Sequence, residues 1–157
     1  MDFPWQWQVA LGALALALLA SAVTDLRNRR ILNAVTFPAL VIELSMFFWL
    51  GGVPLLTEAC IGGLVCTLPL FVAMLKGWMG AGDVKLMALC GVVAGAWAGW
   101  GFSLVVLAYV SVAGGIEALV FIVAARLRGL ERPKYVPYGL AIAAGAAAAF
   151  VFGAPGG

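Results

Sequence analysis

The sequence contains no histidine, and only 10% of its 157 residues are charged. The absence of histidine removes the commonest metal ligand and the commonest general base. Aspartate, glutamate, serine, cysteine and lysine remain as possible working groups. A soluble domain is normally about one quarter charged and about half apolar. This chain is 10% charged and 65% hydrophobic, and its mean hydropathy is +1.11. The composition therefore predicts an integral membrane protein.

Cysteine is also scarce, and its placement excludes two kinds of site. The three cysteines, Cys60, Cys66 and Cys90, all lie in apolar runs and show no Cys-x-x-Cys spacing. This pattern favours small apolar packing residues over a zinc site or a disulfide framework. We expect no metal and no cofactor.

Six apolar runs are separated by short polar or Gly/Pro-containing segments, and the first run, of about 20 residues, is long enough to cross a bilayer. Trp5 and Trp7 suit an aromatic belt at its start. Short connections leave no room for a soluble domain. The sequence thus predicts an all-α, six-transmembrane helical bundle forming a single domain over residues 1–157. The predicted spans are residues 5–24, 34–50, 55–75, 86–100, 102–125 and 136–152.

All nine lysines and arginines fall in the segments that follow the first, third and fifth runs. Basic loops stay in the cytoplasm, so these three loops are predicted to be cytoplasmic and both termini extracytoplasmic. An even number of spans requires the termini to share a side, which agrees with the charges. The nine residues are Arg27, Arg29, Arg30, Lys76, Lys85, Arg126, Arg128, Arg132 and Lys134.

Two acids lie at the predicted cytoplasmic face. Asp25 ends the first run, and Asp83 lies in the loop of residues 76–85 behind Gly80 and Gly82, which allow a tight turn. Two carboxylates can split a peptide bond when they share one proton, because the ionised acid activates water and the protonated acid polarises the carbonyl. The pattern predicts that Asp25 and Asp83 form a catalytic pair.

Structural roles are the alternative for these acids. Asp83 could cap the helix that follows it, whereas Asp25 ends a helix, where an acid is poorly placed relative to the helix dipole. Glu58 is expected near the outer face and solvated. Glu43 and Glu117 are deeper in the membrane and are expected to lie away from the active face.

Three segments resemble a known family. Residues 79–86 read Met-Gly-Ala-Gly-Asp-Val-Lys-Leu, residues 25–33 read Asp-Leu-Arg-Asn-Arg-Arg-Ile-Leu-Asn, and residues 135–143 read Tyr-Val-Pro-Tyr-Gly-Leu-Ala-Ile-Ala. Residues 25–33 resemble the first catalytic segment of the type IV prepilin peptidases, residues 79–86 resemble the second, and residues 135–143 resemble the family's Pro-Tyr-Gly stretch, so the three matches occur in the family's order. Members of this family are membrane aspartic proteases whose Gly-x-Gly-Asp motif is shared with presenilin-like enzymes.

The resemblance implies an endopeptidase of the bacterial cytoplasmic membrane that acts at its cytoplasmic face without a cofactor. Its substrate would be a prepilin-like protein with a basic leader and a hydrophobic helix, and no nucleic acid is expected as a partner. Asp25 and Asp83 would be the catalytic acids, with Gly80, Gly82 and Lys85 as supporting motif residues. Loop residues that would meet substrate or lipid head groups include Arg27, Arg30 and Lys134.

Two departures from the family pattern refine this expectation. The family usually has Ile-Pro-Asn where this chain has Ile31-Leu32-Asn33, which leaves both acids in place. Long members also carry an N-terminal cytoplasmic domain with paired cysteines that is linked to N-methylation. The present sequence resembles the short form that serves Flp/Tad pili, so cleavage is expected without methyl transfer.

Two other function classes remain open from the residues. A small transporter could use Glu43 and Glu117 to line a path, although transporters place such acids at mid-membrane on broken helices, whereas Asp25 and Asp83 lie at one face. A non-catalytic pilus assembly protein could keep the same fold. Substitution of either aspartate separates this last class from a protease.

Overall fold

The computed structural model describes residues 4–28, 31–129 and 138–153, and the regular structure of these residues is entirely helical. Four helices are long and apolar enough to cross a membrane, and a fifth is apolar but shorter. The predicted all-helical membrane protein is therefore confirmed, whereas the count of six spans and their orientation stay predictions. The helices are α1 (Trp5–Asn28), α2 (Asn33–Leu75), α3 (Ala81–Ala98), α4 (Trp100–Leu127) and α5 (Tyr138–Phe152).

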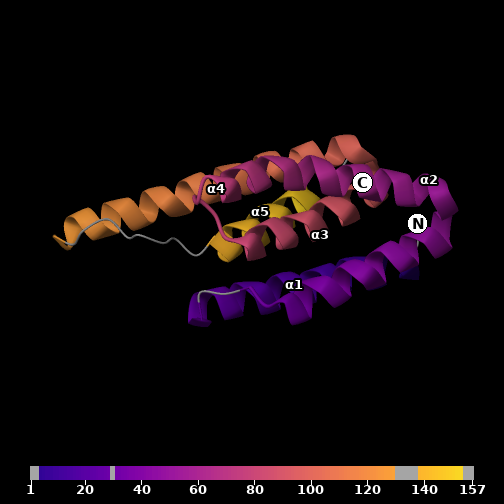
Figure 1. Ribbon diagram of the computed structural model, residues 1–157, viewed down its shortest axis with the longest axis horizontal. Coiled ribbons are helices and arrows are strands. Elements are labelled where there is room, and N and C mark those ends of the chain that lie inside the picture. Colours follow the sequence, from indigo (N-terminus) through magenta and orange to yellow (C-terminus); the bar gives the residue numbers. More distant parts are fainter. Residues whose placement is uncertain (1–3, 29–30, 130–137, 154–157) are drawn as a thin grey trace.

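Helix α2 covers two of the predicted spans. It is 43 residues long, and its helical geometry is interrupted at Gly52, which has φ 61° and ψ −151°. A positive φ is readily available to glycine and costly for most other residues. Figure 1 shows α2 turning back on itself at one end of the bundle. The break predicted between the spans 34–50 and 55–75 is present, as a sharp bend at Gly52 within one helical segment.

The boundaries of α3 differ from the prediction in a way that matters for the site. The helix begins at Ala81 rather than at residue 86, so Asp83 lies in its first turn and not in a loop. At the other end, the break before α4 falls at Gly99, which has φ 81°, and not at Gly101. The reason is that Gly99 takes the left-handed conformation, while Gly101 is helical.

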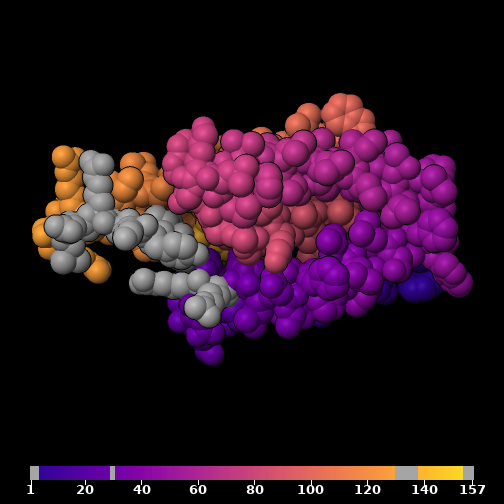
Figure 2. All heavy atoms as spheres, viewed as in Figure 1, coloured from indigo at the N-terminus to yellow at the C-terminus, as the bar shows by residue number. Residues whose placement is uncertain are grey.

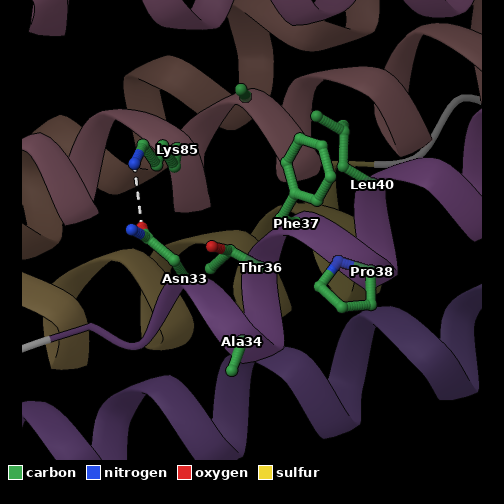
Figure 3. A pocket seen from close by; sticks show the side chains of 8 residues that line it. Asn33, Ala34, Thr36, Phe37, Pro38, Leu40 and Lys85 are labelled. Atoms are coloured by element: carbon green, nitrogen blue, oxygen red, sulfur yellow. Dashed lines mark hydrogen bonds between the residues drawn. The ribbon is translucent and has the colours of Figure 1, made fainter.

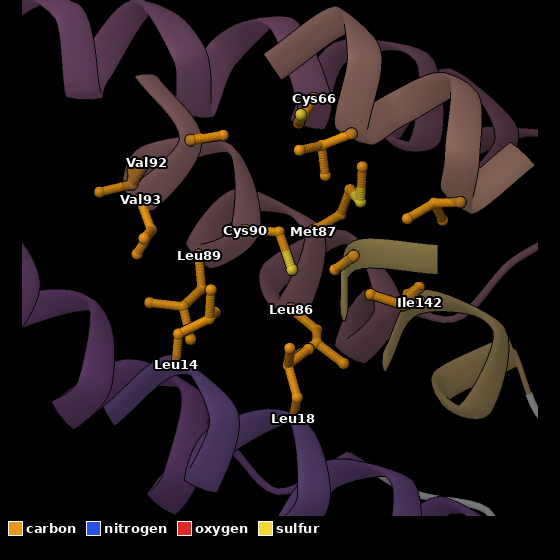
Figure 4. Close-up of a cluster of buried hydrophobic side chains, with 14 of the residues drawn as sticks. Leu14, Leu18, Cys66, Leu86, Met87, Leu89, Cys90, Val92, Val93 and Ile142 are labelled. Atoms are coloured by element: carbon orange, nitrogen blue, oxygen red, sulfur yellow. The ribbon is translucent and has the colours of Figure 1, made fainter. Parts of the chain in front are cut away.

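Helix α3 forms the centre of the protein. Its residues Leu86 and Leu89 are fully buried, and Figure 4 shows them meeting Leu18 and Leu14 of α1. On its other side α3 packs tightly on the second half of α2, where a Cβ at Gly62 would collide with the carbonyl oxygen of Gly91. Glycines on both helices thus allow the two backbones to approach closely.

The two ends of the bundle differ in character. At the bend of α2, aromatic rings from different helices pack together: the ring of Trp7 meets that of Trp97 edge-to-face at 5.0 Å and lies tilted against that of Phe47 at 5.8 Å, measured between ring centroids. At the opposite end, helix ends carry basic residues, such as Arg27 of α1 and Arg126 of α4. Figure 2 shows the final turns of α4 projecting beyond the body of the protein at this end.

Candidate active site

Asp83 is buried in the first turn of α3. Its Oδ2 accepts a hydrogen bond of 3.1 Å from the backbone N–H of Gly80, the residue that precedes the helix. The side chain is 3% exposed, and its Oδ1 is buried without a hydrogen-bond partner among the described residues. Asp83 therefore does serve as a helix cap, but one of its oxygens remains available for other work.

Asp25 is held by a helix far away in the sequence. It lies in the last turn of α1, is 0% exposed, and its Oδ2 accepts a hydrogen bond of 2.9 Å from the backbone N–H of Gly139. Gly139 is in the first turn of α5, where free N–H groups and the helix dipole favour a negative charge. The acid that looked badly placed on its own helix is thus well placed at the start of another.

The glycine at position 139 is required by this arrangement. A Cβ added to Gly139 would lie 2.9 Å from Oδ2 of Asp25 and 3.1 Å from its Cβ. These separations are shorter than an ordinary contact of about 3.5–4.0 Å between non-bonded heavy atoms. The Tyr-Gly pair that resembles the family's third motif therefore owes its glycine to the close approach of α5 to Asp25.

The segments that carry the two aspartates also contact each other directly. The Nζ of Lys85 donates a hydrogen bond of 2.8 Å to Oδ1 of Asn33, and a Cβ added to Gly82 would lie 2.8 Å from Cβ of Ile31. Figure 3 shows the Lys85–Asn33 pair at one end of a cavity between α2 and α3. This cavity of about 480 Å³ is otherwise lined by mostly apolar residues, including Phe37 and Leu40.

The structure thus brings three separate segments to one end of the bundle. The carboxyl groups of Asp25 and Asp83 are close enough to interact electrostatically. Among the weaker predicted site residues, Arg27 has an exposed side chain at the end of α1. Arg30 and Lys134 lie outside the described residues, as do residues 135–137 of the third segment.

A third carboxyl, that of Glu117 on α4, lies with this pair, and the sequence-based expectation that Glu117 is away from the active face was wrong. Glu117 interacts electrostatically with Asp25 and with Asp83. Tyr138, in the first turn of α5, interacts with Asp83 and Glu117 as well. Its ring packs so closely on α4 that a Cβ at Gly114 would collide with the phenol oxygen.

The position of Glu117 in the sequence points to the site only when the full length of α4 is known. Counted from the predicted end of its span, Glu117 seemed more than two turns inside the membrane. However, α4 extends past the ends of its neighbours (Figure 1), so a residue deep within α4 is level with the start of α5. The spacing of Gly114 and Glu117 then places both on one face of α4.

The other two glutamates lie elsewhere. Glu58, expected to be solvated, is partly exposed, and its Oε2 also accepts a hydrogen bond of 2.9 Å from the backbone N–H of Trp100, at the start of α4. Glu43 is 0% exposed, and neither of its carboxyl oxygens has a hydrogen-bond partner in the part of the chain that the structure describes. Within the same residues, no three cysteine, aspartate or glutamate side chains are grouped to hold a metal ion.

Comparison with known proteins agrees with the motif-based resemblance. Residues 12–119 match the model of the type IV leader peptidase family. Over 155 aligned residues the chain is 35% identical to the prepilin leader peptidase/N-methyltransferase of Burkholderia pseudomallei, in strains 1026b and K96243. The alignment covers 94% of this chain and 47% of each relative, so the chain spans about half of their length. No solved structure matches. This multi-pass membrane protein belongs to the type IV leader peptidase family.

Proposed function

We propose that the chain is a membrane aspartic endopeptidase that removes the leader peptide of type IV prepilin-like proteins, with Asp25 and Asp83 as its catalytic pair. One observation carries this proposal. Two buried carboxyls from helices α1 and α3 interact at one end of the bundle. Membership of the leader peptidase family supplies the reaction class.

The surroundings of the two acids suggest different roles. Asp25 accepts a backbone N–H at the start of α5, which stabilises a negative charge, so we assign it as the ionised member. Oδ1 of Asp83 is buried without a partner among the described residues, and an ionised oxygen there would be costly. We therefore assign the shared proton to Asp83.

Peptide cleavage follows from this distribution of one proton. Asp25 takes a proton from a water molecule, whose oxygen attacks the carbonyl carbon of the scissile peptide bond. Asp83 gives its proton to the carbonyl oxygen, forming a tetrahedral diol. Asp25 then gives its proton to the amide nitrogen while Asp83 takes one proton back from the diol, so the C–N bond breaks and leaves a new carboxyl group and a new amine.

The proposed substrate is a Flp-type prepilin, cut at the cytoplasmic face of the bacterial inner membrane. Family membership supports a prepilin as the substrate, and the basic residues on the segments that carry the paired acids, such as Arg27 and Lys85, support the cytoplasmic face. The curated relatives are named for both peptidase and N-methyltransferase activity. We propose peptidase activity alone for this chain.

The proposal is tested by co-expressing the chain with a Flp-type prepilin and following leader removal by gel shift. We expect wild type to cut and Asp25→Asn and Asp83→Asn each to abolish cutting at unchanged membrane expression. Glu58→Gln is the matched control, because it makes the same carboxyl-to-amide change at the other end of the bundle and should still cut.

Two outcomes would contradict the proposal. If wild type leaves the prepilin intact while a known prepilin peptidase cuts it in the same cells, the chain is not a Flp-type prepilin peptidase. If wild type cuts and an Asp→Asn variant cuts equally well, the substituted aspartate is not catalytic.

A further inference from the structure

The proposed reaction gives no role to the cavity of about 480 Å³ between α2 and α3. Its size lies within the range of about 300–1,000 Å³ that is usual for sites that bind small molecules. Among the described residues that line it, only Lys85 is charged. Most of the wall is apolar and comes from both helices, through Ala34, Phe37, Pro38, Leu40 and Ala88.

The cavity lies on a different side of α3 from Asp83. Lys85 follows Asp83 by two residues, and side chains two positions apart on a helix do not face each other. Asp83 is buried, whereas Lys85 is exposed. Lys85 shares its side of the helix with Ala88, which also lines the cavity. The cavity is therefore separate from the space around the proposed catalytic pair.

The charge of the cavity lies at one end, as Figure 3 shows. There the Nζ of Lys85 donates a hydrogen bond of 2.8 Å to Oδ1 of Asn33, which is a neutral partner. None of the described residues that line the cavity is acidic. An ammonium group has three N–H donors, so Lys85 can bind an anion while it keeps its bond to Asn33. This end of the cavity favours an anion with several acceptor oxygens, such as a phosphate group.

The charged end lies at the level where lipid head groups are expected. Lys85 is the fifth residue of α3, so it lies about 6 Å along the axis from the helix start. The segment just before this helix carries Trp78, which is 76% exposed and has the Nζ of Lys76 4.8 Å from its ring centre. Exposed tryptophan and lysine side chains are typical of the boundary between membrane and water.

The apolar part of the cavity adjoins the exposed surface of α2. Phe37 lines the cavity and is 67% exposed, and Val41 and Ile42 continue this exposed apolar surface along the helix. Helix α2 is a candidate membrane span, and an exposed apolar surface on such a helix suits contact with acyl chains. An acyl chain can thus reach the cavity from the bilayer without leaving an apolar environment.

We propose that this cavity binds one phospholipid with a net negative head group, whose phosphate lies at Lys85 and Asn33 and whose acyl chain lies along Phe37 and Leu40. Basic pockets between membrane helices recognise anionic lipid head groups in this way. The leader of the proposed substrate is basic, so the charge of Lys85 favours an anionic lipid over the leader. The inference does not depend on the proposed peptidase reaction, because Asp25 and Asp83 take no part in it.

The experiment counts bound lipids by native mass spectrometry of purified protein in detergent, titrated with dioleoylphosphatidylglycerol or with the uncharged-overall dioleoylphosphatidylcholine. We expect wild type to retain one phosphatidylglycerol about fivefold more tightly than phosphatidylcholine, as expected for one lysine near a lipid surface. Lys85→Met should lose this preference, and Lys85→Arg should keep it. Lys76→Met is the matched control, because Lys76 does not line the cavity, and it should keep the preference.

A second variant tests the cavity without changing the bond between Lys85 and Asn33. Ala34 lines the cavity and is exposed, so a larger side chain can enter there without disturbing the buried core. Ala34→Phe should lower the retention of both lipids several-fold. Thermal unfolding of each variant in detergent checks that the fold is kept.

Several results would overturn the inference. Equal retention of the two lipids by wild type would remove the charged site, and an equal loss of preference in Lys85→Met and Lys76→Met would show diffuse attraction to the basic end. Undiminished retention in Ala34→Phe would place the lipid outside the cavity. Displacement by inorganic phosphate alone would show a site for free anions, and displacement by a Flp-type prepilin would assign the cavity to substrate. A prepilin left uncut by wild type contradicts the proposed function and leaves these lipid measurements unaffected.

Discussion

Substitution of Gly139 by alanine offers the sharpest test of how Asp25 is positioned. The added methyl carbon would lie 2.9 Å from Oδ2 and 3.1 Å from Cβ of Asp25. To restore ordinary contacts, the two groups must separate by about 0.5 Å or more. Because the contact includes the Cβ of Asp25, a rotation of the carboxyl group alone does not relieve it, and α1 or α5 must move.

We expect Gly139→Ala to lower both the stability of the protein and its rate of cleavage. Overpacking of this kind costs about 1–3 kcal/mol, and the better helix propensity of alanine returns up to about 1 kcal/mol. The free energy of unfolding should therefore fall by about 3 kcal/mol or less. Misplacement of a catalytic group by about 1 Å can cost on the order of 100-fold in rate, so we expect Gly139→Ala to cut prepilin roughly 10- to 100-fold more slowly.

The assay compares the initial rate of leader removal per unit of folded protein with the thermal unfolding of the same preparation in detergent. Gly115→Ala is the matched control, because a Cβ at Gly115 meets nothing within 4 Å. Its rate should equal that of wild type. A Gly139→Ala protein that cuts at the wild-type rate would refute the placement of Asp25 against the start of α5 as a requirement for catalysis.

Two further predictions concern parts of the scaffold away from the acids. Glu58→Gln weakens the hydrogen bond to the N–H of Trp100 and should lower the free energy of unfolding by about 1 kcal/mol, measured by thermal unfolding in detergent, with cleavage retained; unchanged stability would argue against this cap. Gly91→Ala brings a methyl group against the backbone of Gly62 and within 2.7 Å of Cβ of Cys66, so the yield of folded protein should drop, with a loss of about 1–3 kcal/mol. Wild-type yield and stability of this variant in size-exclusion and unfolding measurements would contradict the tight packing of α2 on α3.

The sequence predicted the parts of this protein that depend on local composition. Apolar runs identified the helices, and glycine pairs identified the bend near Gly52. The Gly-x-Gly-Asp motif predicted a turn with Asp83 in the loop just before a helix, but the helix begins at Ala81, so Asp83 lies in its first turn. These features are encoded by neighbouring residues, so they can be read without knowing how helices pack.

Features that depend on how far one helix slides past another were missed. The predicted span lengths treated every helix end as lying in the same plane, which put Glu117 inside the membrane and away from Asp83. Because the end of α4 projects beyond its neighbours, the helix ends do not lie in one plane and that assumption fails. The pairing of Asp25 with Gly139 is similar, since the contact joins residues 114 positions apart and no local pattern in either segment specifies it.

The bond from Gly139 to Asp25 also has a consequence for biogenesis. Helix α5 is synthesised after α1, α2, α3 and α4, and its first turn supplies the N–H group that holds Asp25. A nascent chain that has inserted the first four helices therefore has both aspartates but lacks the donor that orients one of them. If Asp25 is catalytic, ribosome-bound or truncated chains that end before residue 138 should therefore fail to cut a prepilin.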